Sequence, residues 1–589
     1  MRLLYMPQPS DGLSKSSPSF SSVGSFSITF ASAMFIFLSA WVFALLASRT
    51  QAQSSTSTST YVESDVPTGT PVPGNYTGEL RPQVHYSPPT SFMNDPNGMF
   101  VDANGTYHLY YQYNPTSNVA GNQHWGHATS RDLYHWINQP IAIYPGATGE
   151  GIFSGSAVID VNNTSGFFPD QDNGVVAFYT LNTAEAETQN IAYSHDGGYT
   201  FTKYAGNPVI PSNSTQFRDP KVFYHAETES WVMVIAYAQE FTIGIYTSAD
   251  LITWTHASNF SHYGLLGLQY ECPNLLPMPM VNSSTELYVL WISINPGAPL
   301  GGSISQYFPG TFNGTHFTPV DNAARISDFA KDNYAGQFFG EIPGTEPQIA
   351  IQWASNWQYA QNVPTGERED WRSAMGLPRT TYLANITRLG YDLIQQPYNL
   401  SSIMGSQLAH STSLANQTII QNYTSVASKA VYLDLNITNF LASGDESGTL
   451  NFTFYSSDSP TTNVSAGFFL GGDSPFWIDR RHSGPFAATN PFFTGLFSTS
   501  VLLPDEGGSY RIQAFIDRSI LEVFLDNGKF TATATFYPPA GVMLDTVKVG
   551  SAELAAGVGI SADVWSLKSA WAAEAGSDGI VKGNVTTLS

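Results

Sequence analysis

Ser-Arg-Asp-Leu-Tyr-His-Trp at residues 130–136 returns as Ser-Ala-Asp-Leu-Ile-Thr-Trp at 248–254, and in a looser form as Ser-His-Asp-Gly-Gly-Tyr-Thr-Phe at 194–201. The three aspartates are 64 and 54 residues apart, and short apolar runs alternate with Gly, Asn, Asp and Pro between them. Repeats of this length with several short strands each are typical of β-propeller blades, because a lone blade cannot bury both of its faces. The sequence therefore predicts an all-β chain that contains a propeller.

Five blades are expected between residues 81 and 400. The segments 153–158 and 331–338 fall where the second and fifth blades should begin. Beyond residue 401 the repeat stops, and three short runs within 511–536 predict a meander. We therefore expect the five-bladed propeller to be followed by a β-sandwich over residues 401–580.

The composition excludes several classes of protein. The chain has 589 residues, of which 23 are basic and 46 acidic, so its formal charge is −23. Aromatic residues make up 14 %, too many for a disordered chain. The negative charge would repel a phosphate backbone, which argues against nucleic acid as a partner. The single cysteine, Cys272, excludes an internal disulfide and a cysteine-based zinc site.

The N-terminal residues predict entry into the secretory pathway. The 22 residues from Phe26 to Ala47 carry no charge and are long enough for a membrane span. We expect residues 1–52 to be a signal peptide or a signal anchor, and residues 53–80 to be a Ser/Thr/Pro-rich linker. Sixteen Asn-x-Ser/Thr sequons occur from Asn75 to Asn584. The expected protein is secreted, cell-surface or periplasmic and N-glycosylated, and a retained membrane anchor stays open.

Three carboxylates each stand at the start of a short apolar run, with a proline close behind: Asp95-Pro96, Asp219-Pro220 and Glu271-Cys272-Pro273. Their spacings of 124 and 52 residues are about two blades and one blade. At such spacing the acids occupy equivalent positions in the innermost strands of blades one, three and four. We therefore expect them to converge on the central funnel.

Three acids in one funnel suit a cation site, a structural hydrogen-bond network or a glycosidase centre. A calcium site needs several oxygen ligands in a compact loop, and no such loop occurs in the sequence. Any one Asp-Pro pair taken alone is better explained as a turn. Glycoside cleavage uses one carboxyl group as a general acid and a second that, in retaining enzymes, attacks the anomeric carbon, the two lying about 5 Å apart. Three acids at blade spacing favour the glycosidase.

Ser91-Phe92-Met93-Asn94-Asp95-Pro96-Asn97-Gly98 closely resembles the Trp-Met-Asn-Asp-Pro-Asn-Gly signature of glycoside hydrolase family 32, the invertases, inulinases and related fructosyltransferases. Residues 153–156, 217–220, 270–273 and 353–357 are also similar to that family, as are residues 515–524 in the second domain. The resemblance covers most of the chain from Arg81 onward. Within the family it points to the secreted yeast-type invertases.

The resemblance implies a role for each acid. Asp95 would be the nucleophile that forms a covalent fructosyl enzyme, Glu271 the acid that protonates the leaving oxygen and later activates water, and Asp219 a stabiliser of the transition state. Neither a metal nor a cofactor is expected. The charge of Asp95 would raise the pKa of Glu271, and an acidic pH optimum is expected. The implied substrate-binding residues are Phe92, Met93, Asn94, Gln112, Trp125, Phe153, Ser154, Arg218 and Trp353.

Two positions depart from the family pattern. Phe92 replaces the family's Trp, which keeps an aromatic wall but loses the indole N–H donor and so bears on substrate preference. Asn274 stands where yeast-type invertases often have Gly, so an extra side chain is expected on the aglycone side. Cys272 could be a nucleophile, but packing beside the acid explains it better.

We expect a retaining β-fructofuranosidase that hydrolyses sucrose and short fructo-oligosaccharides, with some transfructosylation. The alternatives are a chain that acts mainly as a fructosyltransferase, a non-catalytic sugar-binding propeller, and an arabinan hydrolase on the same fold. Loss of Asp95 or Glu271 would mark the sugar-binding alternative, and the full Asn-Asp-Pro-Asn-Gly run argues against arabinan. By the resemblance, a homodimer through the sandwich is also expected.

Overall fold

The computed structural model describes residues 72–281, 283, 286–441, 447–571 and 580–581. The expected leader over residues 1–52, and the expected linker up to residue 71, lie outside the described residues. Among the described residues no helix is both long and apolar enough to cross a bilayer. The helices described are short: α2 (Thr365–Glu369), α3 (Pro485–Thr489), and the 3-10 turns η3 (Ala226–Thr228), η4 (Ala238–Glu240) and η5 (Asp526–Gly528). The remaining elements are strands, which confirms the all-β prediction.

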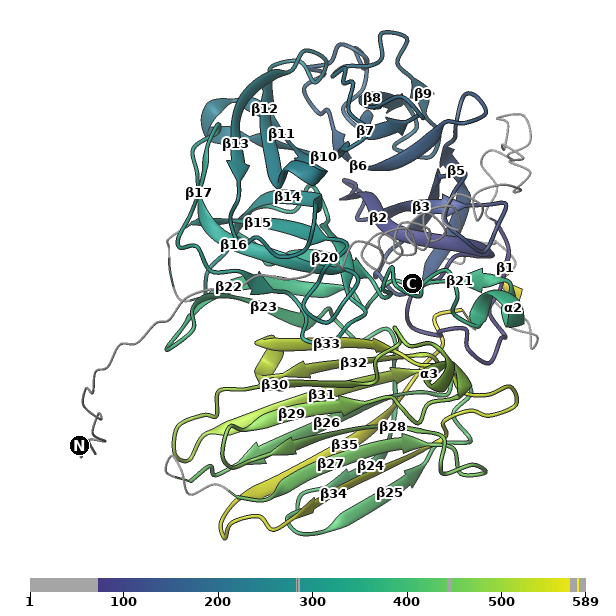
Figure 1. Ribbon diagram of the computed structural model, residues 1–589, viewed down its shortest axis with the longest axis vertical. Helices are drawn as coiled ribbons and strands as arrows, with labels where there is room; N and C mark the ends of the chain where they lie inside the picture. Colours follow the sequence, from purple (N-terminus) through teal and green to yellow (C-terminus); the bar gives the residue numbers. More distant parts are fainter. Residues whose placement is uncertain (1–71, 282, 284–285, 442–446, 572–579, 582–589) are drawn as a thin grey trace, which may run out of the picture. The chain divides into compact units, whose positions relative to one another are not determined.

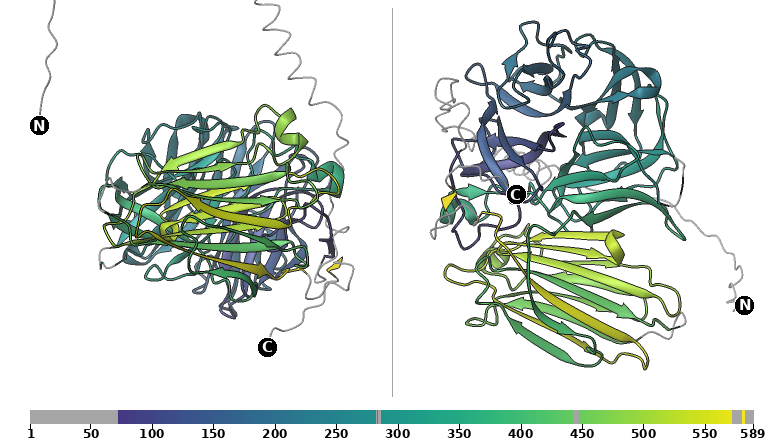
Figure 2. Two further views of the ribbon diagram at one scale, coloured as in Figure 1. Left: turned by 90° about the horizontal axis from the view of Figure 1, so that it is seen from below. Right: turned by 180° about the vertical axis from the view of Figure 1, so that it is seen from behind.

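Residues 91–397 form the propeller, a series of small sheets that follow one another along the chain (Figures 1 and 2). The first two sheets contain β21 (Trp371–Arg372), β2 (Ser91–Val101), β3 (Tyr107–Asn114), β4 (His124–Ser130) and β5 (Trp136–Ile143), and then β6 (Gly151–Ile159), β7 (Val175–Asn182), β8 (Glu187–Ser194) and β9 (Thr202–Lys203). The next two contain β10 (Phe217–His225), β11 (Ser230–Tyr237), β12 (Thr242–Ser248) and β13 (Thr255–Ser261), and then β14 (Tyr270–Met278), β15 (Leu287–Ile294), β16 (Ile304–Phe312), β17 (Phe317–Pro319) and β18 (Arg325–Ile326). The last contains β19 (Tyr334–Phe338), β20 (Gln348–Trp353), β22 (Arg379–Ile386) and β23 (Gly390–Pro397).

The strands β2, β6, β10, β14 and β19 contact one another in this order, and β19 contacts β2. In each of them the pairing register with the next strand shifts near the start: after Met93, Phe153, Arg218, Glu271 and Tyr334. Strand β2 has a second shift, after Asn97. A β-bulge of this kind bends a strand and re-aims the side chains beside it. The bulges therefore turn residues of five separate strands away from ordinary sheet pairing at equivalent positions.

The Ser-x-Asp repeat occupies the same place in three of these sheets, the turn between the third and fourth strands. In the first, Asp132 Oδ1 accepts from the backbone N–H groups of Tyr134 and His135, at 3.0 and 2.8 Å. Asp250 makes the corresponding bonds to two N–H groups in its own turn, at 2.9 and 2.6 Å. Aspartate suits such turns because its short side chain accepts from its own backbone. The repeat is thus a turn signal that occurs once in each of these three sheets.

The sandwich consists of two six-stranded sheets, in which consecutive strands and strands far apart in sequence both pair. One contains β24 (Met404–Ser411), β35 (Gly559–Leu567), β26 (Ala430–Thr438), β31 (Ser509–Asp517), β32 (Ile520–Leu525) and β33 (Phe530–Thr535), and the other β25 (Thr418–Asn422), β34 (Thr546–Ala552), β27 (Thr449–Tyr455), β28 (Asn463–Phe469), β29 (Pro475–Asp479) and β30 (Leu496–Ser500). The expected meander is confirmed as β31–β33.

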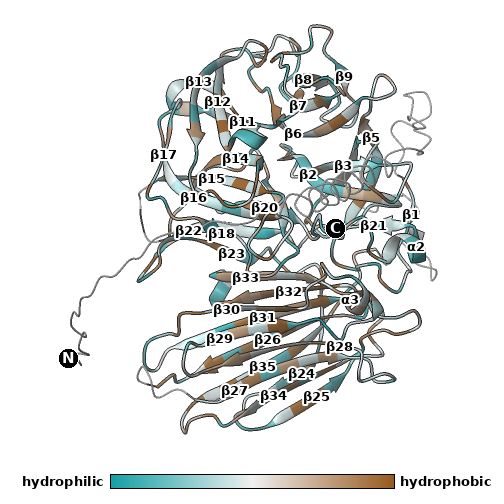
Figure 3. Cartoon of the chain, viewed as in Figure 1, coloured by the Kyte–Doolittle hydropathy of each residue, from teal (hydrophilic) through white to brown (hydrophobic). Residues whose placement is uncertain are grey.

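The core of the sandwich lies between its two sheets. Leu433 and Ile512 from one sheet and Phe452 and Phe476 from the other belong to a single buried apolar cluster. Apolar and polar residues alternate along these strands (Figure 3). This alternation is what a sheet with one buried face requires.

The N-terminal part of the described chain packs against the body of the protein. Strand β1 (Gly74–Asn75) pairs with β36 (Ile580–Val581). Tyr76 stacks on Trp571 with ring centroids 3.7 Å apart, and Leu80 is buried. The packed chain thus begins before residue 81, within the stretch expected to be a linker, because Tyr76 and Leu80 are apolar and have apolar partners.

A buried ionic network joins the sandwich to the propeller strands. Glu522 on β32 accepts from Arg379 Nη2 at 2.8 Å and from the N–H of Leu377 at 2.9 Å. Asp517 accepts from three successive N–H groups, those of residues 83–85, and lies 2.9 Å from His85 Nδ1. Burial alone would raise the pKa of Glu522, but Arg379 and His85 outweigh it and lower that pKa to about 2. The two acids of the 515–524 motif therefore hold the domains together.

Replacing Glu522 with alanine is expected to lower the free energy of unfolding by about 3 to 5 kcal/mol, because Arg379 and His85 would each lose a carboxylate partner while staying buried. Chemical denaturation of the variant and of Glu506→Ala, an exposed control, measures the loss. The pKa of His85 is raised to about 9 from 6.5, so its contribution is full below pH 6.5 and is lost as the pH rises through 9. The contribution of Glu522 is lost as the pH falls from 4.5 towards 2. A loss below about 1 kcal/mol would contradict this account.

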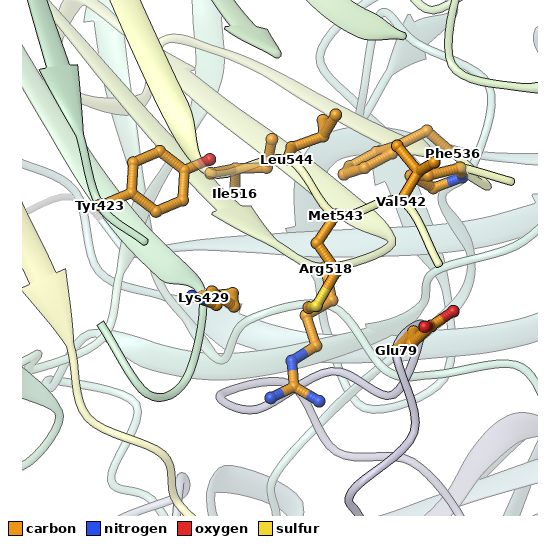
Figure 4. A pocket seen from close by; sticks show the side chains of 10 residues that line it. Glu79, Tyr423, Lys429, Ile516, Arg518, Phe536, Val542, Met543 and Leu544 are labelled. Carbon is orange, nitrogen blue, oxygen red and sulfur yellow. The ribbon is translucent and has the colours of Figure 1, made fainter. Parts of the chain in front are cut away.

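A small cavity lies beside the turn that carries Asp517 (Figure 4). Arg518 runs through the middle of its lining, with Lys429 on one side and Glu79 on the other. The guanidinium of Arg518 donates to the carbonyl of Gly78 at 2.6 Å and its Nε to that of Ser428 at 2.9 Å. The cavity encloses about 10 Å³, the space of one water molecule. It is too small to be a second sugar site.

Candidate active site

Asp95 is held in the bulge of β2 by three side chains. Asn94 Nδ2 donates to its Oδ1 at 3.1 Å, and Ser154 Oγ donates to its Oδ2 at 2.9 Å. The thiol of Cys272 lies 3.6 Å from the same Oδ2. Gln123 Nε2 in turn donates to Asn94 Oδ1 at 3.0 Å and so fixes the orientation of that amide. The carboxylate thus has a defined direction.

Asp219 is brought to the same place from β10. The backbone of Asp219 adopts φ 66°, in the left-handed region, within the bulge after Arg218. Its Oδ2 accepts from the backbone N–H of Cys272 at 2.8 Å, and its own N–H donates to Thr180 Oγ1 at 3.1 Å. Cys272 therefore contacts Asp95 through its sulfur and Asp219 through its backbone, while its neighbour in sequence is Glu271.

Glu271 on β14 has partners from three directions. Gln269 Nε2 donates to its Oε1 at 2.8 Å, and Arg218 Nη1 reaches the same oxygen at 3.3 Å. The hydroxyl of Tyr334 on β19 donates to Oε2. The three acids that the sequence singled out therefore lie in one cluster, and each is at least nine-tenths buried.

Burial is the main cause that raises the pKa of all three carboxyl groups. The charge of Glu271 adds to burial at Asp219 and raises the pKa of that group to about 8. At Glu271 the charge of Arg218 and the hydrogen bond from Tyr334 lower the pKa and so oppose burial. The charge of Asp95 raises this pKa, but by less than burial does. The expectation that Asp95 raises the pKa of Glu271 gives the right direction, but burial is the larger cause.

Arg218 lies between two carboxylates. Its Nε and Nη2 contact the two oxygens of Glu187 on β8 at 2.9 and 2.7 Å, which leaves Nη1 for Glu271. Burial would lower the pKa of Arg218, but the charges of Glu271 and Glu187 keep it above its usual value. Its ring neighbour is Phe153, whose centroid lies 6.0 Å from the guanidinium carbon.

Aromatic residues form one wall beside the acids. Phe92 lies 6.0 Å from Trp357 and 6.5 Å from Trp353, measured between ring centroids, and belongs to an apolar cluster with Cys272 and Tyr334. The indole of Trp353 donates to the carbonyl of Met93 at 3.1 Å. Phe92 and Trp353 are fully buried, so both shape the wall.

Gln112 and Trp125 lie beside the strand that carries Ser154. Gln112 Nε2 donates to the carbonyl of Ile152 at 3.0 Å, and the indole of Trp125 donates to that of Phe153 at 3.0 Å. Both side chains are buried. In this structure they hold β6 against the first sheet, and through Ser154 they support Asp95.

The expectation for Asn274 is wrong. Its side chain is fully buried, and its Nδ2 donates to the carbonyls of Cys272 and Gly336 at 3.2 and 3.1 Å. Its Oδ1 accepts from the N–H of Phe338 at 3.3 Å. The bulge between Glu271 and Asn274 turns this side chain towards the backbone of β19 rather than towards the aglycone side. Burial also raises the pKa of the Cys272 thiol, which supports packing over a nucleophilic role.

Four residues of the cluster were absent from the sequence analysis: Gln123, Glu187, Gln269 and Tyr334. Gln269 lies two positions before Glu271, so alternation along an extended segment could have placed it beside the acid. Gln123 immediately precedes β4, Glu187 begins β8 and Tyr334 begins β19. Only the tertiary fold brings these three residues to the acids.

Comparisons with known proteins agree over both domains. Residues 85–397 match the model of the glycosyl hydrolases family 32 N-terminal domain, and residues 399–566 that of the family's C-terminal domain. The chain is 41 % identical to invertase 2 of Saccharomyces cerevisiae over 80 % of this chain and 91 % of that one. It is 41 % identical to an extracellular exo-inulinase of Meyerozyma guilliermondii over 80 % of this chain and 92 % of that one. A fructofuranosidase of Schwanniomyces occidentalis, solved with fructose, superposes with a TM-score of 0.76 at 36 % identity, covering 84 % of this chain and 99 % of that one.

Proposed function

The chain belongs to glycoside hydrolase family 32, and from this membership and the cluster of acids we propose that it is a retaining β-fructofuranosidase acting on sucrose and short fructo-oligosaccharides. The observation that carries the proposal is the meeting of Asp95, Asp219 and Glu271 around Cys272. The names of the relatives support hydrolysis of sucrose and fructan.

In the first step the carboxylate of Asp95 attacks the anomeric carbon of the fructosyl unit. The bond from this carbon to the leaving oxygen breaks, and Glu271 gives its proton to that oxygen. Asp219 stabilises the transition state by holding fructose hydroxyls. The contacts from Asn94 and Ser154 support this role of Asp95, because they aim its carboxylate without neutralising it.

In the second step Glu271, now ionised, takes a proton from water as the water oxygen attacks the same carbon. The ester bond to Asp95 breaks, fructose leaves with retained configuration, and Glu271 is protonated again. Activity needs Asp95 ionised and Glu271 protonated at once. The raised pKa of Glu271 supports an acidic to neutral working range.

The aromatic and polar residues around the acids are proposed to bind the fructosyl unit, with Phe92, Met93, Trp125 and Trp353 shaping the pocket and Asn94, Gln112, Phe153, Ser154 and Arg218 at its polar and open side. A sugar hydroxyl that replaces water in the second step gives transfructosylation by the same chemistry. Phe92 lacks the indole donor of tryptophan, which changes what the pocket offers to an incoming acceptor.

A time course with concentrated sucrose tests the proposal. Hydrolysis releases free glucose and free fructose in equal amounts, whereas transfer gives a deficit of fructose together with new oligosaccharides. We expect both sugars from the start and a small deficit of fructose at high sucrose. Absence of glucose release from sucrose, together with absence of fructose release from 1-kestose, would overturn the proposal.

The finer organisation is proposed on the same grounds. We infer five blades between residues 81 and 400, supported by the cyclic contacts of β2, β6, β10, β14 and β19, and a sandwich over residues 401–580.

The extracellular inulinase among the relatives supports secretion. N-linked glycans and a homodimer through the sandwich are part of the proposal, and intact mass with and without glycosidase treatment and light scattering test them.

A further inference from the structure

Glu187 is a buried carboxylate outside the set of acids that the sequence singled out. It begins β8 in the second sheet, and 1 % of its surface is exposed. Its Oε2 accepts from the N–H of Phe217 at 2.7 Å and from Arg218 Nε at 2.9 Å, and its Oε1 lies 2.7 Å from Arg218 Nη2. It therefore binds both the backbone and the side chain at the point where β10 enters the site.

This arrangement divides the donors of Arg218 between two acids. Nη2 is also within 2.9 Å of the carbonyl of Thr215 and of Gln216 Oε1, so the Nε and Nη2 side of the guanidinium is fully used. Only Nη1 points to Glu271, at 3.3 Å. Because the guanidinium is planar, fixing one edge fixes the direction of the other.

We propose that Glu187 is a positioning residue for catalysis, which holds Arg218 so that one guanidinium nitrogen faces Glu271 and balances the proton affinity of that acid. This inference rests on the proposed function of Glu271. Without Glu187 the guanidinium is free to turn fully towards Glu271, and a negative charge near Glu271 is lost.

The charged and titratable groups that face Glu271 decide the direction of the effect. Arg218 and Asp219 face it from β10, Asp95 from β2 and Tyr334 from β19, with Glu187 behind Arg218. The charge of Glu187 favours the protonated form of Glu271, and Arg218 favours the ionised form. Removing the charge of Glu187 should therefore lower the pKa of Glu271, and removing the contact from Arg218 should raise it.

The test compares pH profiles of kcat on sucrose for the full-length wild type, Glu187→Gln and Arg218→Lys. In Glu187→Gln the alkaline limb is expected to shift to lower pH by about 0.5 to 1 pH unit, the effect of removing one charge at this distance. We expect kcat to fall about tenfold and KM to change by about twofold at most. In Arg218→Lys the alkaline limb is expected to shift to higher pH, because the shorter cation cannot reach both Glu187 and Glu271. Glu185→Gln, an exposed neighbour on the same loop, is expected to match the wild type.

Opposite movements of the two limbs support the proposal. An unchanged limb in Glu187→Gln, with only a lower melting temperature, would overturn it and assign Glu187 a structural role. If Glu187→Gln does not fold, Arg218→Lys alone decides, and an unmoved limb there counts against the proposal. Failure of the wild type to cleave sucrose would instead overturn the proposed function.

Discussion

Replacing Asp95 with asparagine is expected to lower kcat on sucrose by about 10⁴-fold or more, the scale of loss when a catalytic unit loses its reacting member. An amide does not form the fructosyl ester. The other two acids cannot substitute, because Asp219 is bound to the N–H of Cys272 and Glu271 to Arg218 and Tyr334. Kinetics with sucrose, and mass spectrometry for a covalent fructosyl adduct, measure the effect.

The fold is expected to survive this change. Burial raises the pKa of Asp95, which means that the ionised carboxylate is costly in its site, so a neutral amide of similar shape should leave the melting temperature unchanged or slightly higher at neutral pH. Asp172→Asn, at an exposed loop position, serves as the matched control. Substantial turnover by well-folded Asp95→Asn would remove Asp95 from the role of nucleophile.

The sequence was informative where one short segment carries both the structural signal and the chemistry. The Ser-x-Asp turns fold through bonds within a few residues, so their recurrence predicted the sheets. The acids lie in bulges at the starts of first strands, and their regular spacing predicted that they would meet. Both features are local, which is why they could be read without coordinates.

What depends on the register between strands could not be predicted. Asn274 was expected to face the aglycone side, but Cys272 adopts φ 46° in the bulge and turns the next residues to the backbone of β19. Glu187 lies about thirty residues before Arg218 in sequence and meets it only because β8 and β10 belong to neighbouring sheets. The acids of the 515–524 motif are likewise explained by partners in the propeller, Arg379 and His85, which no periodicity within the sandwich reveals.

Replacing Glu271 with glutamine is expected to lower kcat on sucrose by about 10³-fold, within the range that general acid–base catalysis contributes. Glutamine cannot protonate the leaving glucosyl oxygen, which is a poor leaving group. In a nitrophenyl β-fructofuranoside the nitrophenolate leaves without a proton, so the first step with this substrate should slow by less than about tenfold. Rapid-mixing measurement of nitrophenol release separates the two cases, with Glu185→Gln as the control.

The second step gives this prediction a further consequence. Without a base at position 271, water attacks the fructosyl enzyme slowly, so the first turnover with the nitrophenyl substrate should appear as a burst followed by a slow steady state. Azide is already an anion and needs no base, so it should accelerate the steady state and yield fructosyl azide with the configuration of the substrate. The fall of the burst rate at alkaline pH should also disappear. This fall arises from ionisation of Glu271, whose pKa is raised by burial. Equal losses on sucrose and on the nitrophenyl substrate in the burst phase would show that Glu271 is not the acid, and Tyr334 or Arg218, its hydrogen-bond partners, would then be the next candidates.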